Sequence, residues 1–521
     1  MTFENVSDRR HAWWHALVHS SGCAALMVIA GCGGGGGGGG ESGGSASIPI
    51  ADAQHCAAPR ALGALDPDGS PYGDVQGTVA DEKAWVRAYI DQTYLWYQDV
   101  RGLSATTLDP NAYTTAVTYF DVLKSPAVTA SGKPKDQFHF IYETPEWIAL
   151  SRSGQSYGYG FELALLSTTP PRQAVVAFTN PGTPATNANI TRGAQILTVD
   201  GVDLVNTGTQ AGVDALNAGM FPSAAGNHTF TIRDLGSATT RVVTLAAGTQ
   251  TSTPVQNVKT LPAPNNQVGY LQFNDHIATS EVQLINAINQ LKTAGVTDLV
   301  IDIRYNGGGY LDIASELAYM VAGPTQTSGK VFEQLNFNDQ NPFGFTDAQR
   351  TTPFHSVGQD FVKGTTANQA LPYLGLSRVY VLTGSGTCSA SEAIINGLRG
   401  AGVTVNQIGT ATCGKPYGFY PQDNCGTTYF AIQFQGVNQL GFGDYADGFA
   451  PTCSVADDFN HALGDPAEAR LAMALGHRKS GTCVPASSVG VAKAQALGVT
   501  SIVEPVLVRS PLRENRFYRQ R

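Results

Sequence analysis

The sequence has few charged residues and little basic character. Only 14% of its 521 residues are charged, and 41 acidic side chains against 32 basic ones give a net charge of −9. Domains that bind nucleic acid usually present an excess of Lys and Arg, so this balance argues against a nucleic-acid partner. Because 42% of the residues are hydrophobic, the chain can bury a large core, and its length predicts about two to four domains.

Long hydrophobic runs are also missing. No stretch of eighteen apolar residues follows Cys32, so the mature chain is not expected to span a membrane. Near the start, Arg9 and Arg10 precede a short apolar run at 24–30, which is too brief to cross a bilayer. This pattern is typical of an export signal. A twin-arginine signal is a weaker match, because the residues after the two arginines do not fit it.

The end of this signal carries a candidate lipid anchor. Ile29-Ala30-Gly31-Cys32 resembles the bacterial lipoprotein signal, which implies a signal peptide over 1–31 and lipidation of Cys32. The glycine run 33–40 cannot bury apolar surface, so 32–55 is expected to be a flexible tether. The predicted location is the bacterial cell envelope, lipid-anchored and facing the periplasm or the cell exterior. The alternative is an ordinary signal peptide with a chance cysteine.

Metal-binding motifs are absent as well. The sequence contains neither a CxxC pair nor HExxH, so neither a zinc site nor any other metal or cofactor is expected. After the signal and the lipidated cysteine, an even number of cysteines remains, which in an exported chain predicts disulfides. Their connectivity cannot be deduced from the sequence. These cysteines are Cys56, Cys388, Cys413, Cys425, Cys453 and Cys483.

Residues 381–415 carry the strongest chemical signal. An apolar β-branched run leads into small residues and then an amphipathic helix pattern, so a strand delivers a turn to a helix start. This geometry exposes a side chain beside outward backbone N–H groups, which suits Ser389 as a nucleophile. Lys415 lies among Gly, Pro and aromatic residues and is a candidate general base. The alternatives are a helix-capping Ser389 with a solvated Lys415, or Cys388 as the nucleophile.

A second strand, glycine turn and helix follow the same plan. The buried run 298–304 ends in Asn306-Gly307-Gly308-Gly309, and a helix is expected over 311–321. Glycines here would let the backbone approach a substrate closely. Phosphate binding is disfavoured, because the turn lacks both the Walker lysine and GxGxxG spacing.

These motifs resemble those of the carboxyl-terminal processing serine peptidases, also called tail-specific proteases. GTCSASEAI followed by Gly-Lys matches their nucleophile and base motifs, which implies a dyad of Ser389 and Lys415. DIRYNGGG resembles their DLRxNxGG motif, which implies an oxyanion site made by the N–H groups of Gly308, or its neighbour Gly307, and Ala390. Many relatives carry a Gln four residues after the lysine. Here Phe419 replaces it, so Gln422 or another group would orient the base.

Residues 150–250 show short strands broken by Gly, Pro and Asn, and two places resemble a PDZ domain. A Gly-punctuated loop would bind a substrate carboxylate through backbone N–H groups. ITRGAQILTVDGVDL at 190–204 resembles the PDZ strand-turn-strand, although Arg192-Gly193-Ala194 replaces the usual Gly-Asp. A helix at 210–219 is expected to line the peptide groove. The predicted substrate-binding residues are Tyr157, Gly158, Tyr159, Gly160 and Phe161.

The remaining regions complete an α/β fold class: a crotonase/ClpP-like βαβ protease domain, a PDZ-like β-rich domain and a small helical N-terminal domain. The predicted boundaries are 56–148 for the helical domain, 150–250 for the PDZ-like domain, 254–483 for the peptidase domain, beginning with a Pro-rich linker at 254–266, and 484–521 for a basic, solvated C-terminal tail. The expected function is cleavage of proteins near their C-terminal tails. The alternatives are a non-catalytic scaffold lipoprotein that holds protein tails and, less well supported, a crotonase-type acyl-CoA enzyme.

Overall fold

The computed structural model describes residues 50, 53–65, 71–222, 224–483, 506–508 and 516–517. The predicted signal peptide, Cys32 and most of the tether lie outside these residues. All described residues belong to one unit of the chain, Ser45–Arg521. Among them, none of the helices combines the length and the apolar character needed to cross a bilayer.

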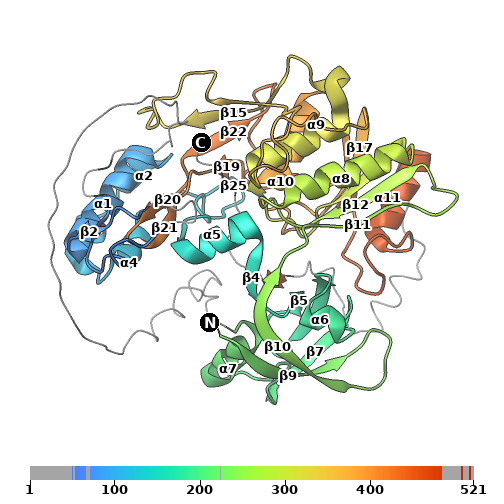
Figure 1. Ribbon diagram of the computed structural model, residues 1–521, viewed down its shortest axis with the longest axis horizontal. Helices are drawn as coiled ribbons and strands as arrows, with labels where there is room; N and C mark the ends of the chain where they lie inside the picture. The colour runs from blue at the N-terminus through green and yellow to red at the C-terminus, as the bar shows by residue number, and fades with distance from the viewer. Residues whose placement is uncertain are drawn as a thin grey trace. The chain divides into compact units, whose positions relative to one another are not determined.

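A six-stranded sheet forms the centre of residues 254–483, the predicted peptidase region (Figure 1). Its strand order is β11-β12-β13-β17-β18-β23, and every pair is parallel except β11 with β12. The central strands β12 and β13 are buried along their whole length, which explains their apolar runs. Their bounds are β11 Val255–Thr260, β12 Val268–Phe273, β13 Asp298–Asp302, β17 Arg378–Thr383, β18 Thr404–Gly409 and β23 Cys453–Ser454.

Helices cover both faces of this sheet. Alternate residues of one strand point to opposite faces, so Leu299 and Ile301 pack with α8, α9 and α10, whereas Val300 packs with α11 on the other side (Figure 1). The helices span α8 Ser280–Thr293, α9 Leu311–Thr327, α10 Ala390–Gly400 and α11 Ala469–Ser480. Asp465 and Pro466 are start signals that predict a helix over 465–475. The helix begins later, at Ala469, because Glu468 caps it by accepting the Leu471 N–H.

The PDZ-like region is a twisted sheet with short helices. Its strand order is β24-β5-β6-β7-β9-β10-β4, with β8 paired to β7. The strands are β4 Gln155–Gly158, β5 Phe161–Ser167, β6 Gln173–Thr179, β7 Gln195–Val199, β8 Val202–Asp203, β9 Gly226–Arg233, β10 Arg241–Thr251 and β24 Val506–Val508. The helices are α5 Thr144–Ser153, α6 Pro184–Asn187 and α7 Gln210–Met220, so the predicted groove helix is present.

The N-terminal region is built on buried aromatic residues. Helix α1, Val79–Thr93, places Trp85 and Tyr89 in the core, as its aromatic spacing predicts. The sequence also predicts a helix over 113–123, but the helix in this stretch is shorter and spans α4, Ala116–Phe120. The smaller elements are β1 His55–Cys56, β2 Val75–Gln76, α2 Tyr97–Arg101, α3 Ala105–Leu108, a 3₁₀ turn at Pro110–Ala112 and β3 Phe140–Glu143.

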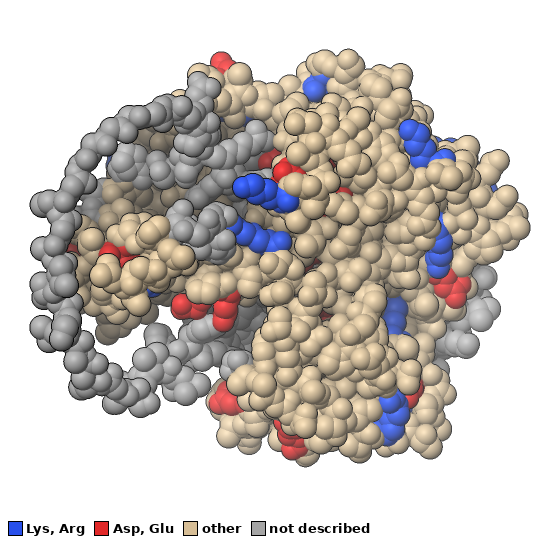
Figure 2. All heavy atoms as spheres, viewed as in Figure 1, with Lys and Arg blue, Asp and Glu red and all other residues tan. Residues whose placement is uncertain are grey.

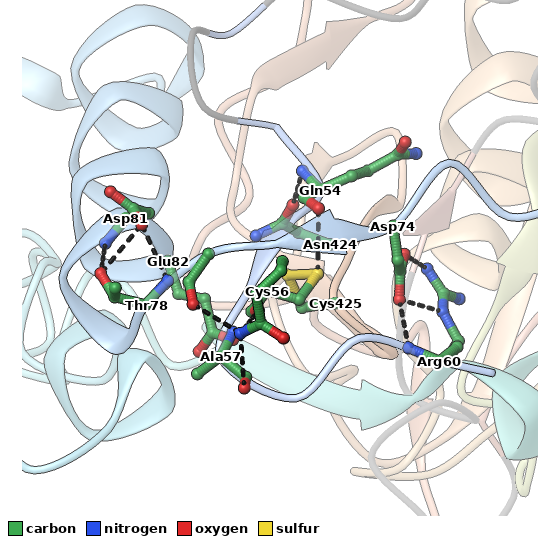
Figure 3. Close-up of a disulfide and its surroundings, with 12 residues drawn as sticks. Gln54, Cys56, Ala57, Arg60, Asp74, Thr78, Asp81, Glu82, Asn424 and Cys425 are labelled. Atoms are coloured by element: carbon green, nitrogen blue, oxygen red, sulfur yellow. Dashed lines mark hydrogen bonds and ion pairs between the residues drawn. A yellow bond between two sulfur atoms is a disulfide. The ribbon is translucent and has the colours of Figure 1, made fainter. Parts of the chain in front are cut away.

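A disulfide joins this region to the peptidase region (Figure 3). Cys56 pairs with Cys425, and beside it the Gln54 N–H donates to Asn424 Oδ1 over 2.7 Å. Arg60 and Asp74 form a further ion pair nearby. The other four cysteines among the described residues pair as Cys388–Cys413 and Cys453–Cys483, so the prediction of disulfides is confirmed.

Small sheets follow the catalytic motifs, and two predictions about the chain here are wrong. The sequence predicts a hairpin over 417–434 that turns at Gln422-Asp423-Asn424. The hairpin instead turns at Cys425-Gly426, both with positive φ, and 422–424 forms a strand. The expected linker at 254–266 contains β11, whose prolines flank the strand and remove no ladder bond. These sheets contain β14 Gly309–Tyr310, β15 Val331–Phe337, β16 Thr351–Pro353, β19 Tyr417–Gly418, β20 Gln422–Asn424, β21 Thr427–Phe430, β22 Phe434–Val437 and β25 Arg516–Phe517.

A buried ionic network links the PDZ-like and peptidase regions. Arg192 donates to Asp457 Oδ1 over 2.7 Å and to the Tyr305 hydroxyl over 2.6 Å, and Arg304 donates to the same Asp457 oxygen. Burial alone would raise the pKa of Asp457, but the two guanidinium charges hold it well below its usual value.

On the face of the molecule drawn in Figure 2, charged side chains are scattered among other residues.

Candidate active site

Ser389 stands at the junction of β17 and α10. It is the residue before the helix, is fully buried, and has φ 59° and ψ −115°. Positive φ is uncommon for a residue with a side chain and costs about 1–3 kcal/mol, so the surrounding structure must impose it. A strained serine between a strand and a helix is the geometry of a nucleophile elbow.

Lys415 is also fully buried, and aromatic rings surround its amine. Its Nζ lies 4.5 Å from the ring centre of Phe138 and 4.4 Å from that of Phe419. Phe419 occupies the position where many relatives carry a Gln, so here that position offers a ring face to the amine. Gln422 is buried in β20.

The carboxylate of Glu392 binds the backbone of both residues. Its Oε2 accepts the Ser389 N–H over 2.9 Å and the Lys415 N–H over 2.8 Å. Its Oε1 accepts the Gly414 N–H and the Thr412 hydroxyl. Because both amides donate to this one oxygen, the backbones of Ser389 and Lys415 are held close together. Burial raises the pKa of Glu392, while these hydrogen bonds and the start of α10 favour its charged form.

A disulfide also joins the loop of Ser389 to the loop of Lys415. Cys388, next to Ser389, is bonded to Cys413, with 5.2 Å between their Cα atoms. The Cys413 N–H also donates to the Thr387 carbonyl over 3.0 Å. Because Cys388 is oxidised here, it offers no thiolate, and this counts against the alternative in which it is the nucleophile. For the same reason the cluster of Cys388, Glu392 and Cys413 does not suit a metal ion.

The glycine turn of the second motif is organised by Asn306. Its side-chain oxygen accepts the Gly308 N–H and faces His276 Nδ1, each over 3.0 Å, and its amide donates to the Phe273 carbonyl. Its backbone carbonyl accepts the Cys388 N–H and the Ser391 hydroxyl. The turn is thereby fixed to the nucleophile loop. The predicted oxyanion donor Gly308 is engaged with Asn306 in this conformation.

The predicted carboxylate loop, 157–161, joins β4 to β5. Tyr159 is buried and donates its hydroxyl to the Gly219 carbonyl of α7 over 2.6 Å, so its side chain packs inside the domain. Tyr157 stays 39% exposed. Gly158 and Gly160 both have positive φ, and a side chain on Gly160 would meet Thr183, which explains the glycines.

Sequence reasoning missed three parts of this site. Glu392 was noted only as a motif position, although its spacing from Ser389 is that of a helix-capping pair and was a usable signal. Phe138 and His276 lie far from both motifs in the sequence, and no local pattern points to either of them.

Comparisons with known proteins identify two regions of similarity. Residues 267–419 match the model of peptidase family S41, and residues 148–219 match the model of the PDZ domain. A carboxyl-terminal-processing protease of Picosynechococcus sp. is 28% identical over 171 residues, and one of Synechocystis sp. is 25% identical over 172 residues. Each match covers 33% of this chain and about two fifths of the relative, 40% and 39% respectively.

A solved structure extends the likeness to most of the chain. The putative S41 protease of Bacteroides fragilis shares 25% identity with a TM-score of 0.57, covering 79% of this chain and 98% of that one. The predicted resemblance to the carboxyl-terminal processing peptidases, the PDZ-like region and the α/β fold class are thereby confirmed.

Proposed function

We propose that this chain, whose α/β region is a peptidase family S41 domain preceded by a PDZ domain, is a serine endopeptidase that cleaves proteins near their C-terminal tails. One observation carries the proposal. A serine in a strained turn and a buried lysine bind the same carboxylate oxygen of Glu392 through their backbone amides. The loop of Ser389 and the loop of Lys415 are thus held together at the two residues of the proposed dyad.

The proposed reaction is acyl transfer. A general base must be a neutral amine, and we assign this role to Lys415, which is fully buried. Lys415 Nζ takes the proton of the Ser389 hydroxyl while Oγ attacks the scissile carbonyl carbon. The C–N bond then breaks, and the leaving amine receives that proton. Water, activated by the same amine, hydrolyses the acyl-serine to a carboxylate and restores both groups.

The oxyanion would be stabilised by the N–H groups of Ala390 and of the glycine turn. For Gly308 to take this part, its N–H must exchange Asn306 Oδ1 for the oxyanion. Gly307 is the neighbouring alternative. The PDZ domain supplies the other half of the function, because a strand edge next to a backbone loop suits an extended protein tail.

Incubation with an unstructured protein that carries an exposed tail tests this function. The wild-type chain should shorten the protein from its C-terminal side, whereas Ser389→Ala and Lys415→Ala should each cut at most about 10⁻⁴ as fast, with unchanged circular dichroism. Mass spectrometry of proteins retained by Ser389→Ala would then identify the substrates. Cleavage by either variant at the wild-type rate contradicts the proposed dyad, and cleavage by none of the three favours a scaffold.

The location is part of the proposal. We infer that the chain is exported to a bacterial cell envelope and held there by a lipid on Cys32. Replacing Cys32 by Ala should abolish incorporation of a radiolabelled fatty acid and release the protein from membranes. A fatty acid that is still incorporated after this replacement would contradict the anchor.

A further inference from the structure

Part of the chain beyond the peptidase region pairs with the PDZ sheet. Strand β24 lies antiparallel to β5, with Val506 opposite Leu165, Leu507 opposite Ala164 and Val508 opposite Leu163. It is the terminal strand of that sheet. Strand β5 starts where the predicted carboxylate loop ends, so β24 runs along it toward that loop. Addition of a strand to a sheet edge is how a PDZ domain binds an extended peptide.

Leu507 connects this strand with the peptidase region. Its partly buried side chain packs against a cluster that includes Ala164 and Val175 of the PDZ sheet and Tyr305, the residue before Asn306. Its Cδ1 lies 3.5 Å from the position where a side chain on Gly386 would begin, in the turn that leads to Ser389. In contrast, Val506 of the same strand is 49% exposed. The apolar contact of β24 is therefore directed at the nucleophile loop.

A second piece of the same segment lies beside the glycine turn. Strand β25 pairs in parallel with β14, so that Arg516 is opposite Gly309 and Phe517 opposite Tyr310. It also contacts β19, which begins two residues after Lys415 (Figure 1). Backbone next to both the glycine turn and the base is where an extended substrate must pass. The sequence predicted a solvated basic tail, and the structure instead pairs these two parts of it with strands.

We propose that the two tail strands, 506–508 and 516–517, are the resident ligand of the β5 edge and of the backbone at the glycine turn, and that they compete with substrate within the chain. The inference rests on the proposed peptidase function. It also identifies a substrate class: extended segments rich in aliphatic residues, like the Val-Leu-Val of β24, fit the edge of β5. A tethered ligand acts at an effective concentration on the order of mM. A free peptide that binds at about 0.1 mM must therefore overcome roughly tenfold competition.

The test compares two substitutions in the full chain that place the same charge on one strand. Leu507→Asp puts a carboxylate into the apolar cluster and should release β24, lowering the KM for an unstructured protein substrate about tenfold with kcat unchanged. Val506→Asp is the matched control, because that side chain is half exposed, and its KM should stay within about twofold of wild type. Leu507→Ala adds no charge and should shift KM the same way by a smaller factor. An unchanged KM in both Leu507 variants would overturn the proposal.

A binding experiment separates this inference from the peptidase function. In the Ser389→Ala background, a fluorescein-labelled peptide with the sequence of residues 504–510 should bind about tenfold more tightly once Leu507→Asp is added. Equal affinity with and without that change contradicts the resident ligand, whatever the activity. Tighter binding together with no cleavage by any variant would support the ligand and reject the peptidase.

Discussion

Replacing Glu392 by Gln probes the feature on which the site depends. The carboxylate accepts hydrogen bonds on both oxygens, two on each. A glutamine has the same shape but only one acceptor oxygen, so two of the four donors lose their partner. If the Ser389 and Lys415 amides lose their acceptor, the loops that carry these two residues are both released. If Gly414 and Thr412 lose their acceptor, only the loop that carries Lys415 is released.

The size of the effect follows from this count. A buried donor without an acceptor costs about 1–3 kcal/mol, so two cost about 2–6 kcal/mol. Glutamine also removes the cost of burying a charge, which the raised pKa of Glu392 reflects. We therefore expect the free energy of unfolding to fall by about 2–3 kcal/mol. Turnover should fall by about 10²-fold in the molecules that remain folded, because a shift of about 1 Å in a catalytic group costs that much.

Glu281→Gln is the matched control. Glu281 is equally buried and binds four donors of the 359–366 loop in the same way, two on each oxygen. Chemical denaturation should show a loss of stability in both variants, while kcat should fall only in Glu392→Gln. Wild-type turnover in folded Glu392→Gln, or an equal fall in kcat in Glu281→Gln, would refute the role given to the shared carboxylate.

Three further predictions concern other parts of the structure. Asn306→Ala removes the side chain that ties the glycine turn to the Phe273 carbonyl, so the turn should shift and kcat for a peptide substrate should fall by about 10²-fold. A kcat near wild type would show that this side chain does not position the turn. Arg192→Leu breaks a buried ion pair and should cost about 3–5 kcal/mol in urea unfolding, and the double variant with Asp457→Asn should lose less than the two single losses together. Burial and the neighbouring carboxylate of Glu281 raise the pKa of Glu316 well above its usual value, so stability should fall as pH rises from the usual value to the raised one. Glu316→Gln should match wild type below the usual carboxyl pKa and exceed it increasingly as pH rises toward the raised value, and parallel pH profiles for the two proteins would contradict this.

Much of the fold follows from local pattern. The largely apolar run 268–273 is bordered by polar residues and predicts a strand, and β12 has the same bounds. Helix α7 and the strand-glycine-helix units follow for similar reasons. The β11 segment was missed because its prolines signal a linker, although proline is tolerated at the ends of an edge strand. The hairpin turn was misplaced because Asp and Asn favour turns as strongly as the Cys-Gly that forms it.

The site itself was less accessible from sequence. Ser389 and Lys415 follow from motifs, but their surroundings come from chain segments that are distant in sequence. Phe138, from the N-terminal region, reaches the lysine amine, and His276 faces Asn306 from the loop after β12. The Cys388–Cys413 pairing depends on the packing of two loops against each other, which the spacing of the cysteines does not determine. Tertiary packing decides such contacts, and single-sequence patterns do not report it.

Labelling with a fluorophosphonate tests the central claim most directly, because the reagent phosphonylates a serine only when that serine is activated. Intact mass and peptide mapping should locate one adduct on Ser389 of the wild-type chain. No adduct is expected in Ser389→Ala, and labelling should be at least about 10²-fold slower in Lys415→Ala. A wild-type chain that is folded but unlabelled at Ser389, or labelled equally fast without Lys415, would contradict the account.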